Sequence, residues 1–397
     1  MAGLGLIAAA GALALLIGRP TVHREVIEYE SSFDGTAPLH AVCFYTRPGR
    51  GGRPIVVVMH GYTGSYSRME WTAQRFAKAG FLAVCPNMRG RKAADADSAG
   101  TPDSGGREIL DILDALTTAS ARYDWADSGS ANIVGYSGGG GNALSAVTKL
   151  PETFRYAVSY FGISDYAAWF DHAVEYRSRI AAWVDGTPAT TPERYAARSS
   201  AAAAGNALAT RVLLFWDSEE KVCQPEMNRE FIRVAKEAGA PTVVGHESLP
   251  TDEYRWVHGR PKDNQQLLES ERLYLPDMLA GGPAPRLPDE GTLTVAGYVA
   301  CSDFRLFAGN WDDATGVLEY KRGPDGMSFS WSVTTPDKTV ASRLEARPPA
   351  GKSVTVVTVN GSPRSTERVG EWVRIERLAD GDTVEVAFTT VAVGSAE

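Results

Sequence analysis

A serine in a glycine-rich turn has the clearest chemical use of any residue in this sequence. Ser137 stands in Gly135-Tyr136-Ser137-Gly138-Gly139, directly after the apolar run Asn132–Val134 and before the helical pattern Asn142–Leu150. A sharp strand-to-helix turn lifts a serine above the sheet, and the helix N-terminus behind it favours developing negative charge. We therefore predict that Ser137 is a nucleophile; the alternative is an ordinary glycine-rich turn.

A second motif, His60-Gly61-Tyr62, follows the apolar run Ile55–Met59. A tetrahedral intermediate needs two backbone N–H groups that point at one oxygen. The Gly138 amide, directly after the serine, supplies one of them. We place the other at the Tyr62 amide, and we expect His60 to hold the loop rather than to act as a base.

The serine needs a base that accepts its proton, and histidine is the usual choice. Three histidines follow Ser137 in the chain. His172 lies in a predicted cap, and His246 is too close to its own strand. His258 comes just before the last predicted helix, so we predict it as the base, with His246 as the alternative.

The acid that orients this histidine should follow the apolar run Val212–Trp216. The chain there reads Asp217-Ser218-Glu219-Glu220, so three carboxylates compete. One of them must be buried against the imidazole, where it holds the tautomer and stabilises the imidazolium. We favour Glu220, then Asp217, then Glu219, and we expect the other two to form a solvated turn.

The elements that position these residues follow an alternating pattern from about residue 21 to 280. Strand-like runs at 55–59, 81–85, 132–134, 156–161, 212–216 and 242–245 alternate with helical spacing at 67–80, 107–121, 142–150, 228–239 and 264–279. This alternation predicts a doubly wound, mostly parallel sheet with helices on both faces. Residues 165–210 interrupt it with an alanine-rich, helical stretch, interpreted as a cap or as a packed excursion without a substrate role.

The pattern changes after a Pro/Gly linker at 281–289. Short β-type runs separated by turn signals such as Asn360-Gly361 predict an all-β sandwich over 290–397. Trp311, Trp331 and Trp372 would stack on sugars if exposed, although aromatic residues in strands usually belong to the core. Since every proposed site residue precedes the linker, we expect the two domains to separate in function.

The stretch from 54 to 280 resembles an α/β hydrolase of the prolyl oligopeptidase and acetyl xylan esterase type. The matching pieces are His60-Gly61-Tyr62, Arg89-Gly90, Asp111, Asp114, Gly135–Gly139 and parts of 192–199. The resemblance implies an α/β-hydrolase fold and a serine mechanism. It also places Glu220 where the family's Gly-x-x-Asp-x-x-Val-Pro loop has Asp, although the Gly, Val and Pro have changed here. Residues 357–388 resemble accessory β-sandwiches of carbohydrate-active enzymes.

Composition argues against several other classes of protein. The net charge of −8 disfavours nucleic acid as a partner. The four Cys and six His show no metal-ligand spacing, and Asp95–Gly100 would start a calcium loop whose fifth and twelfth positions, Ala99 and Gly106, lack side-chain ligands. We therefore expect neither a metal nor a cofactor.

The N-terminal segment 1–20 is largely apolar, and Met1–Gly18 contains no charged residue. This length just reaches that of a membrane span. We interpret it as a signal, an anchor or a buried helix, which favours a secreted or membrane-anchored protein over a cytoplasmic one.

The expected activity is hydrolysis of small or glycan-linked carboxylic esters. The 54 residues before Ile55 are too few for the propeller that screens peptides in oligopeptidases. The alternatives are a peptidase for short peptides and a binding protein on a hydrolase scaffold; the complete set of serine, acid and histidine argues against the last.

Overall fold

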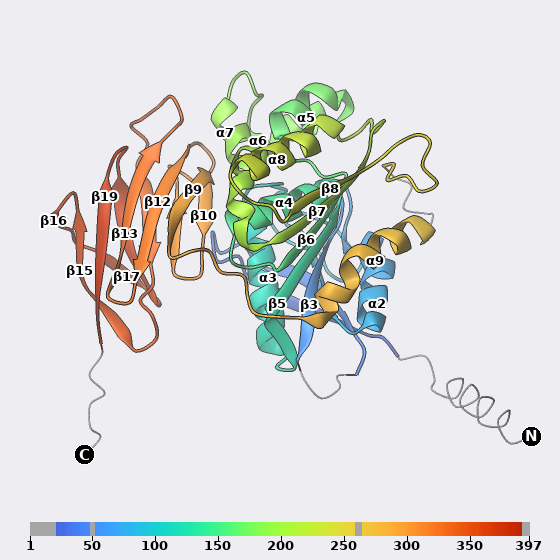
Figure 1. Ribbon diagram of the computed structural model, residues 1–397, viewed down its shortest axis with the longest axis horizontal. Coiled ribbons are helices and arrows are strands. Elements are labelled where there is room, and N and C mark those ends of the chain that lie inside the picture. The colour runs from blue at the N-terminus through green and yellow to red at the C-terminus, as the bar shows by residue number, and fades with distance from the viewer. Residues whose placement is uncertain (1–20, 48–51, 259–263, 391–397) are drawn as a thin grey trace, which may run out of the picture.

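A computed structural model describes residues 21–47, 52–258 and 264–390. Within them, eight strands form one sheet in the order β1-β2-β4-β3-β5-β6-β7-β8 (Figure 1). The neighbouring strands from β4 to β8 pair in parallel, whereas β1 and β2 add an antiparallel edge. The strands are β1 (His23–Tyr29), β2 (Leu39–Tyr45), β3 (Arg53–Met59), β4 (Leu82–Asn87), β5 (Ala126–Tyr136), β6 (Tyr156–Tyr160), β7 (Arg211–Asp217) and β8 (Val243–Ser248).

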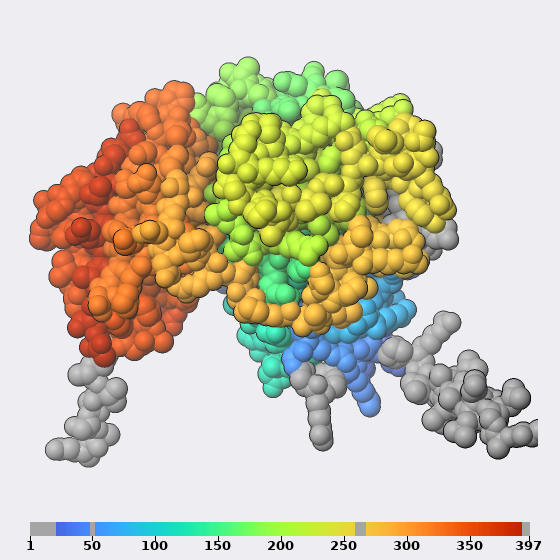
Figure 2. All heavy atoms as spheres, viewed as in Figure 1, coloured from blue at the N-terminus to red at the C-terminus, as the bar shows by residue number. Residues whose placement is uncertain are grey.

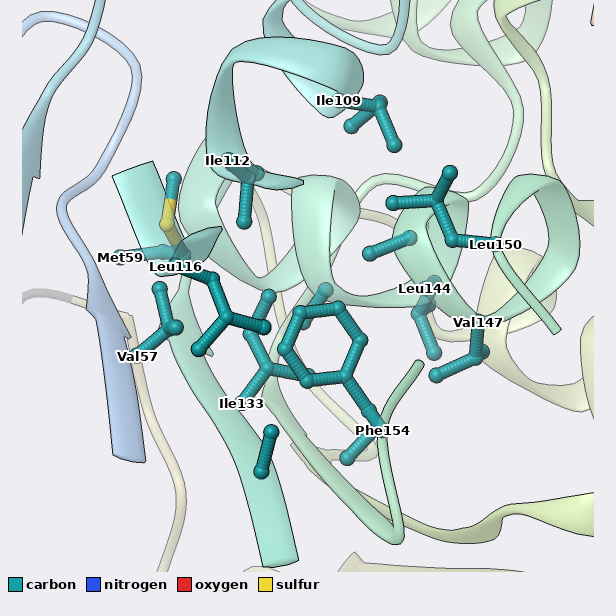
Figure 3. Packing of buried hydrophobic residues seen from close by; sticks show 14 of the residues in the cluster. Val57, Met59, Ile109, Ile112, Leu116, Ile133, Leu144, Val147, Leu150 and Phe154 are labelled. Atoms are coloured by element: carbon teal, nitrogen blue, oxygen red, sulfur yellow. The ribbon is translucent and has the colours of Figure 1, made fainter. Parts of the chain in front are cut away.

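Helices cover both faces of this sheet because its central strands are apolar on both sides. In β3, Val57 and Met59 belong to the core under α3 (Glu108–Arg122), α4 (Gly138–Lys149) and α8 (Pro225–Glu237) (Figure 3). Val56 and Val58 face the opposite core, under α2 (Glu70–Ala79) and α9 (Asn264–Ala280). The structure thus has the doubly wound α/β-hydrolase arrangement that the sequence predicts.

The stretch predicted as a cap is helical and lies against the carboxyl edge of the sheet. It comprises α5 (Tyr166–His172), α6 (Arg177–Val184), α7 (Pro192–Arg198) and the 3₁₀ segments η2 (Val174–Tyr176) and η3 (Ala201–Ala209). Three aromatic rings of this stretch surround Tyr62: Trp169 at 5.6 Å, Tyr176 at 5.9 Å and Trp183 at 3.9 Å between ring centroids. The cap therefore packs directly on the loop that follows β3.

The C-terminal region is antiparallel, and its strands form one continuous hydrogen-bonded sheet. The sheet folds over on itself around one core, because the rings of Phe304 and Phe329, from strands four places apart in the sheet, lie 5.2 Å apart between centroids. Eleven strands follow the order β16-β15-β19-β13-β12-β9-β10-β11-β14-β18-β17. Only Gly297, at φ 78°, separates β9 from β10, so the chain bends there and carries the pairing onward. The strands are β9 (Glu290–Ala296), β10 (Tyr298–Ala300), β11 (Phe304–Phe307), β12 (Thr315–Gly323), β13 (Gly326–Val333), β14 (Ser342–Ala346), β15 (Lys352–Val359), β16 (Ser362–Pro363), β17 (Glu367–Val369), β18 (Trp372–Leu378) and β19 (Thr383–Thr390).

The C-terminal sheet lies beside the large sheet and its helices (Figures 1 and 2). The two parts share apolar core and polar contacts. Tyr298, Ala300 and Phe307 belong to the same core as the helices on one face of the large sheet. Glu152, just after α4, is buried and accepts hydrogen bonds from Arg322 Nη1 at 2.7 Å and Leu287 N at 2.9 Å. The C-terminal sheet therefore packs against α4, the helix that follows Ser137.

The three tryptophans considered for sugar binding are engaged within the protein. Trp331 is 1% exposed and belongs to the core of the C-terminal sheet. Trp311 packs edge-on against Phe33, with 5.5 Å between ring centroids. Trp372 is covered by the guanidinium groups of Arg305 and Arg347, at 4.2 and 5.2 Å from its ring centroid. None of the three is an open stacking platform.

The segment Met1–Gly18 lies outside the described residues. Among the residues that the structure describes, no helix is both long and apolar enough to span a membrane.

Candidate active site

Ser137 occupies a strained turn between β5 and α4. Its backbone angles, φ 56° and ψ −123°, lie in a region that non-glycine residues rarely adopt. The turn closes tightly, because a Cβ added to Gly135 would lie 2.0 Å from Gly139 O, and one added to Gly139 would lie 2.5 Å from Met59 O. Only glycine fits at these two positions, and the result is a half-buried serine at the carboxyl edge of the sheet.

The loop after β3 brings a second amide next to this turn. A Cβ on Gly138 would lie 2.8 Å from Tyr62 N, and one on Gly61 would lie 3.6 Å from Ser137 Cβ. Within the described part of the chain, the Tyr62 amide donates to no protein group. The Gly138 and Tyr62 backbones are thus neighbours beside Ser137, as an oxyanion site requires.

His60 is buried and holds the loop. Its Nε2 accepts a hydrogen bond from Met88 N at 3.2 Å, and its Nδ1 lies 2.9 Å from Gly61 O. Burial lowers the pKa of His60 to about 4, so the ring is neutral at physiological pH. These two contacts fit a ring that orients the Gly61–Tyr62 backbone rather than one that moves protons.

His258 faces Glu220. Glu220 Oε1 lies 3.4 Å from His258 Nδ1, within ion-pair range, and Oε2 accepts a hydrogen bond from His258 N at 2.9 Å. Oε1 also accepts from Val222 N at 2.8 Å. Burial would raise the pKa of Glu220, but the contacts with His258 and the backbone amides outweigh it and lower that pKa below its usual value. Glu220 is therefore ionised and beside the imidazole.

The other two carboxylates of the loop bind a different side chain. Asp217 is buried and receives two hydrogen bonds from Arg255, at 2.7 and 2.6 Å, and Glu219 accepts one from the same guanidinium at 2.8 Å. The sequence predicts a solvated turn for them; Asp217 is instead buried, because Arg255 neutralises it.

The remaining histidines have other contacts. His246 stacks on Phe215, with 4.7 Å between ring centroids, and His172 Nε2 lies 2.7 Å from Lys221 O. Of the histidines that follow Ser137, His258 is the one that lines a cavity with it.

Part of the chain matches a known protein family. Residues 67–246 match the model of the prolyl oligopeptidase family. This segment is a prolyl oligopeptidase family domain. The resemblance predicted from the sequence is confirmed.

Individual relatives match shorter parts. The chain is 33% identical over 110 residues to a bis(hydroxyethyl) terephthalate hydrolase of Streptomyces coelicolor, covering 28% of this chain and 33% of that protein. It is 31% identical over 142 residues to an epoxide hydrolase of Caballeronia sordidicola, covering 35% and 37%. The chain thus spans about a third of the length of these relatives.

A solved structure extends the likeness in fold. The acylaminoacyl peptidase of Pyrococcus horikoshii superimposes with a TM-score of 0.54 at 19% identity, covering 68% of this chain and 43% of that one. At this identity the likeness concerns the fold alone.

A cavity of about 520 Å³ opens beside Ser137. Ser137, Tyr62 and His258 all line it, together with aromatic rings from α2, the strand ends and the cap: Trp71, Tyr136, Phe161, Trp169 and Tyr176. Arg68 also lines it, whereas no carboxylate does among the described residues. The cavity thus suits an apolar or aromatic group close to the serine.

Sequence reasoning missed two features of this cavity. Phe161 follows β6 with φ 41° and places its ring centroid 4.7 Å from that of His258. Its place at the carboxyl end of a predicted parallel strand is the signal that could have found it. Arg68 stands in η1 (Tyr66–Met69), a short 3₁₀ turn that has no distinctive sequence pattern.

The residues considered for a calcium loop are engaged with protein groups. Asp95 pairs with Arg24 Nη1 at 2.8 Å, and Asp97 pairs with Lys92 at 3.2 Å. Among the described ranges, no group of three or more His, Cys, Asp or Glu side chains is placed to hold a metal ion.

Proposed function

We propose that the protein is a serine hydrolase that cleaves carboxylic esters through an acyl-enzyme. Ser137 Oγ attacks the ester carbonyl, and His258 Nε2 takes the serine proton. The Gly138 and Tyr62 amides bind the oxyanion, while Glu220 stabilises the imidazolium. His258 then protonates the leaving alcohol, and a water molecule deprotonated by the same imidazole hydrolyses the acyl-enzyme.

The observation that carries this proposal is the combination of Ser137 and the Glu220-bound His258 around one cavity. Ser137 and His258 line it with Tyr62, whose backbone amide lies next to Gly138. A nucleophile, a base oriented by an acid and two neighbouring amides are the parts that acyl transfer requires.

The cavity lining favours an ester over a free peptide. A peptide N-terminus carries an ammonium group, and the described lining offers it no carboxylate. The aromatic rings suit an apolar or aromatic acyl group, and the name of the Streptomyces coelicolor relative refers to an aromatic ester. A peptidase acting on short peptides is the second candidate. The family match favours it, and an N-blocked peptide would bring no unpaired ammonium.

The first experiment compares substrates. Purified protein is assayed against p-nitrophenyl esters of increasing chain length, a benzoate ester, acetylated sugars, and free and N-acetylated aminoacyl-p-nitroanilides. We expect the esters to be turned over fastest and the free aminoacyl anilides slowest. Faster cleavage of the N-acetylated anilides than of the esters would support the peptidase instead.

The second experiment removes the nucleophile. Ser137→Ala should abolish labelling by a fluorophosphonate probe and lower turnover on the order of 10⁶-fold. Ser145→Ala, in the same helix, is the control and should label like the wild type. Undiminished labelling of Ser137→Ala would place the nucleophile elsewhere.

A further inference from the structure

The segment that carries His258 has little regular structure of its own. After β8 ends at Ser248, the chain runs to His258 without a helix or strand. A general base must keep its geometry to a fraction of an ångström, so a loop needs fixed anchors to hold one. The anchors of this segment are therefore part of the site.

One anchor is a two-pronged ion pair. Arg255 Nε and Nη2 donate to the two oxygens of Asp217 at 2.7 and 2.6 Å. Such a paired fork fixes the orientation of both groups as well as their distance. Because Asp217 is the last residue of β7, the fork ties the segment to the central sheet three residues before His258.

The same anchor includes the end of β8. Ser248 Oγ donates to Asp217 Oδ2 at 2.7 Å and accepts from Trp256 N at 3.0 Å. Asp217 and Ser248 are also paired in the register of the two strands. The strand ends thus hold Arg255 and Trp256, and Glu220 then holds the backbone of His258 itself.

We propose that Asp217 and Arg255 are positioning residues, which together form a clamp that sets the place of His258. This inference rests on the proposed function, since it assigns the clamp to the base of that reaction. The three carboxylates of the loop then have different partners: Asp217 and Glu219 bind Arg255, and Glu220 contacts His258.

The buried carboxylate of Asp217 needs the positive charge of Arg255. Burial would raise the pKa of Asp217, but Arg255, Ser248 and the Glu219 amide outweigh it and lower that pKa below its usual value. Removing Arg255 leaves a buried carboxylate without its counter-charge. The loop would then open to hydrate Asp217, and His258 would move with it.

The test uses the full chain and five variants: Arg255→Met, Arg255→Lys, Asp217→Asn, the double variant Arg255→Met with Asp217→Asn, and the control Arg229→Met. Arg229 is a matched control because it also pairs with two carboxylates, Glu226 and Glu247, but lies on the surface of α8. Each variant is assayed for kcat and KM on the best p-nitrophenyl ester, for the rate of fluorophosphonate labelling, and for Tm.

We expect Arg255→Met and Asp217→Asn to lower kcat about 10²-fold with KM nearly unchanged, since misplacing a base affects the transition state more than binding. The labelling rate should fall in parallel. Arg255→Lys keeps the charge but not the fork, so its loss should be intermediate. The double variant should be no worse than the worse single variant, because both break one clamp. Arg229→Met should match the wild type.

A folded Arg255→Met with wild-type kcat would overturn the clamp, and so would a loss confined to KM. If Arg255→Met does not fold, full kcat in folded Arg255→Lys and Asp217→Asn would overturn it equally. The proposed function fails separately, if Ser137→Ala keeps its labelling and turnover.

Discussion

Glu220 contacts both the ring and the backbone of His258. We therefore expect its substitution to lower kcat more than substitution of Asp217 or Glu219. Glu220→Gln should keep the acceptor for His258 N but lose the charge that stabilises the imidazolium. We expect a loss in kcat on the order of 10⁴-fold. This exceeds the loss expected for Asp217→Asn, and Glu219→Gln should cost least. Steady-state kinetics of the three variants make the comparison.

The opposite ranking would contradict the assignment of the acid. If Asp217→Asn costs more kcat than Glu220→Gln in folded proteins, Asp217 supplies the charge for the imidazole and the clamp is not its role.

Single residues were predictable where their chemistry depends on local sequence. Ser137 and Gly138 belong to one turn, and Tyr62 lies three residues after the end of β3 at Met59. The choice among Asp217, Glu219 and Glu220 was not decidable in this way. It depends on Arg255, which lies 38 residues after Asp217 and reaches it only in the folded chain.

The helix after Ser137 ends in a buried lysine that joins three segments. Lys149 Nζ donates to Ala197 O at 2.7 Å and to Ala296 O, and lies 4.4 Å from the Tyr298 ring centroid. Burial, with a smaller contribution from Arg198, lowers the pKa of Lys149 to about 7 from 10.5. The end of α4 thus carries a group that titrates near neutral pH.

Stability should therefore depend on pH through Lys149. Between pH 7 and 10.5 the unfolded chain keeps a proton that the folded chain has released. The free energy of unfolding then rises with pH across this window, while below pH 7 both states are protonated and the burial cost remains in full. We expect urea unfolding at several pH values to show this rise in the wild type and to show less of it in Lys149→Met. Lys236→Met, an exposed lysine on α8, is the control. Equal slopes in Lys149→Met and the wild type would contradict the assignment.

Elements were predictable where burial produces a continuous apolar run. The central strands β3 to β8 have such runs, at least in part. The edge strand β1 was missed, because it reads His-Arg-Glu-Val-Ile-Glu-Tyr and mixes exposed charges with buried residues. The bend at Gly297 was missed for another reason: one glycine between two strands gives no signal that pairing continues across it.

At the scale of the whole molecule, the linker at 281–289 predicts two domains that fold independently. The contacts between the C-terminal sheet and the large sheet instead indicate that the first domain needs the second for its stability. A chain ending at residue 280 would lose Tyr298 and Phe307 from the main core and leave Glu152 without Arg322. The apolar side chains that Tyr298 and Phe307 cover would then face water, and an exposed apolar patch promotes aggregation. We expect this truncation to be insoluble or inactive, measured by circular dichroism and ester turnover.

A chain ending at residue 390 is the control for this truncation and should behave as the wild type. If the chain ending at 280 is soluble and hydrolyses small esters within about tenfold of the wild type, as expected of a domain that folds alone, the shared core is dispensable.

The shared core has a consequence for anyone who expresses part of this gene. The family match ends at residue 246, before His258 and before the strands at 298–307 that complete the packing around α4. A fragment cut at the family boundaries would carry the proposed nucleophile without its proposed base. A frameshift or stop codon between residues 290 and 298 would spare every residue of the proposed site and still remove the residues that pack around the helix behind Ser137. In genetic terms, this stretch of the reading frame should be as intolerant of nonsense mutations as the part that encodes the serine.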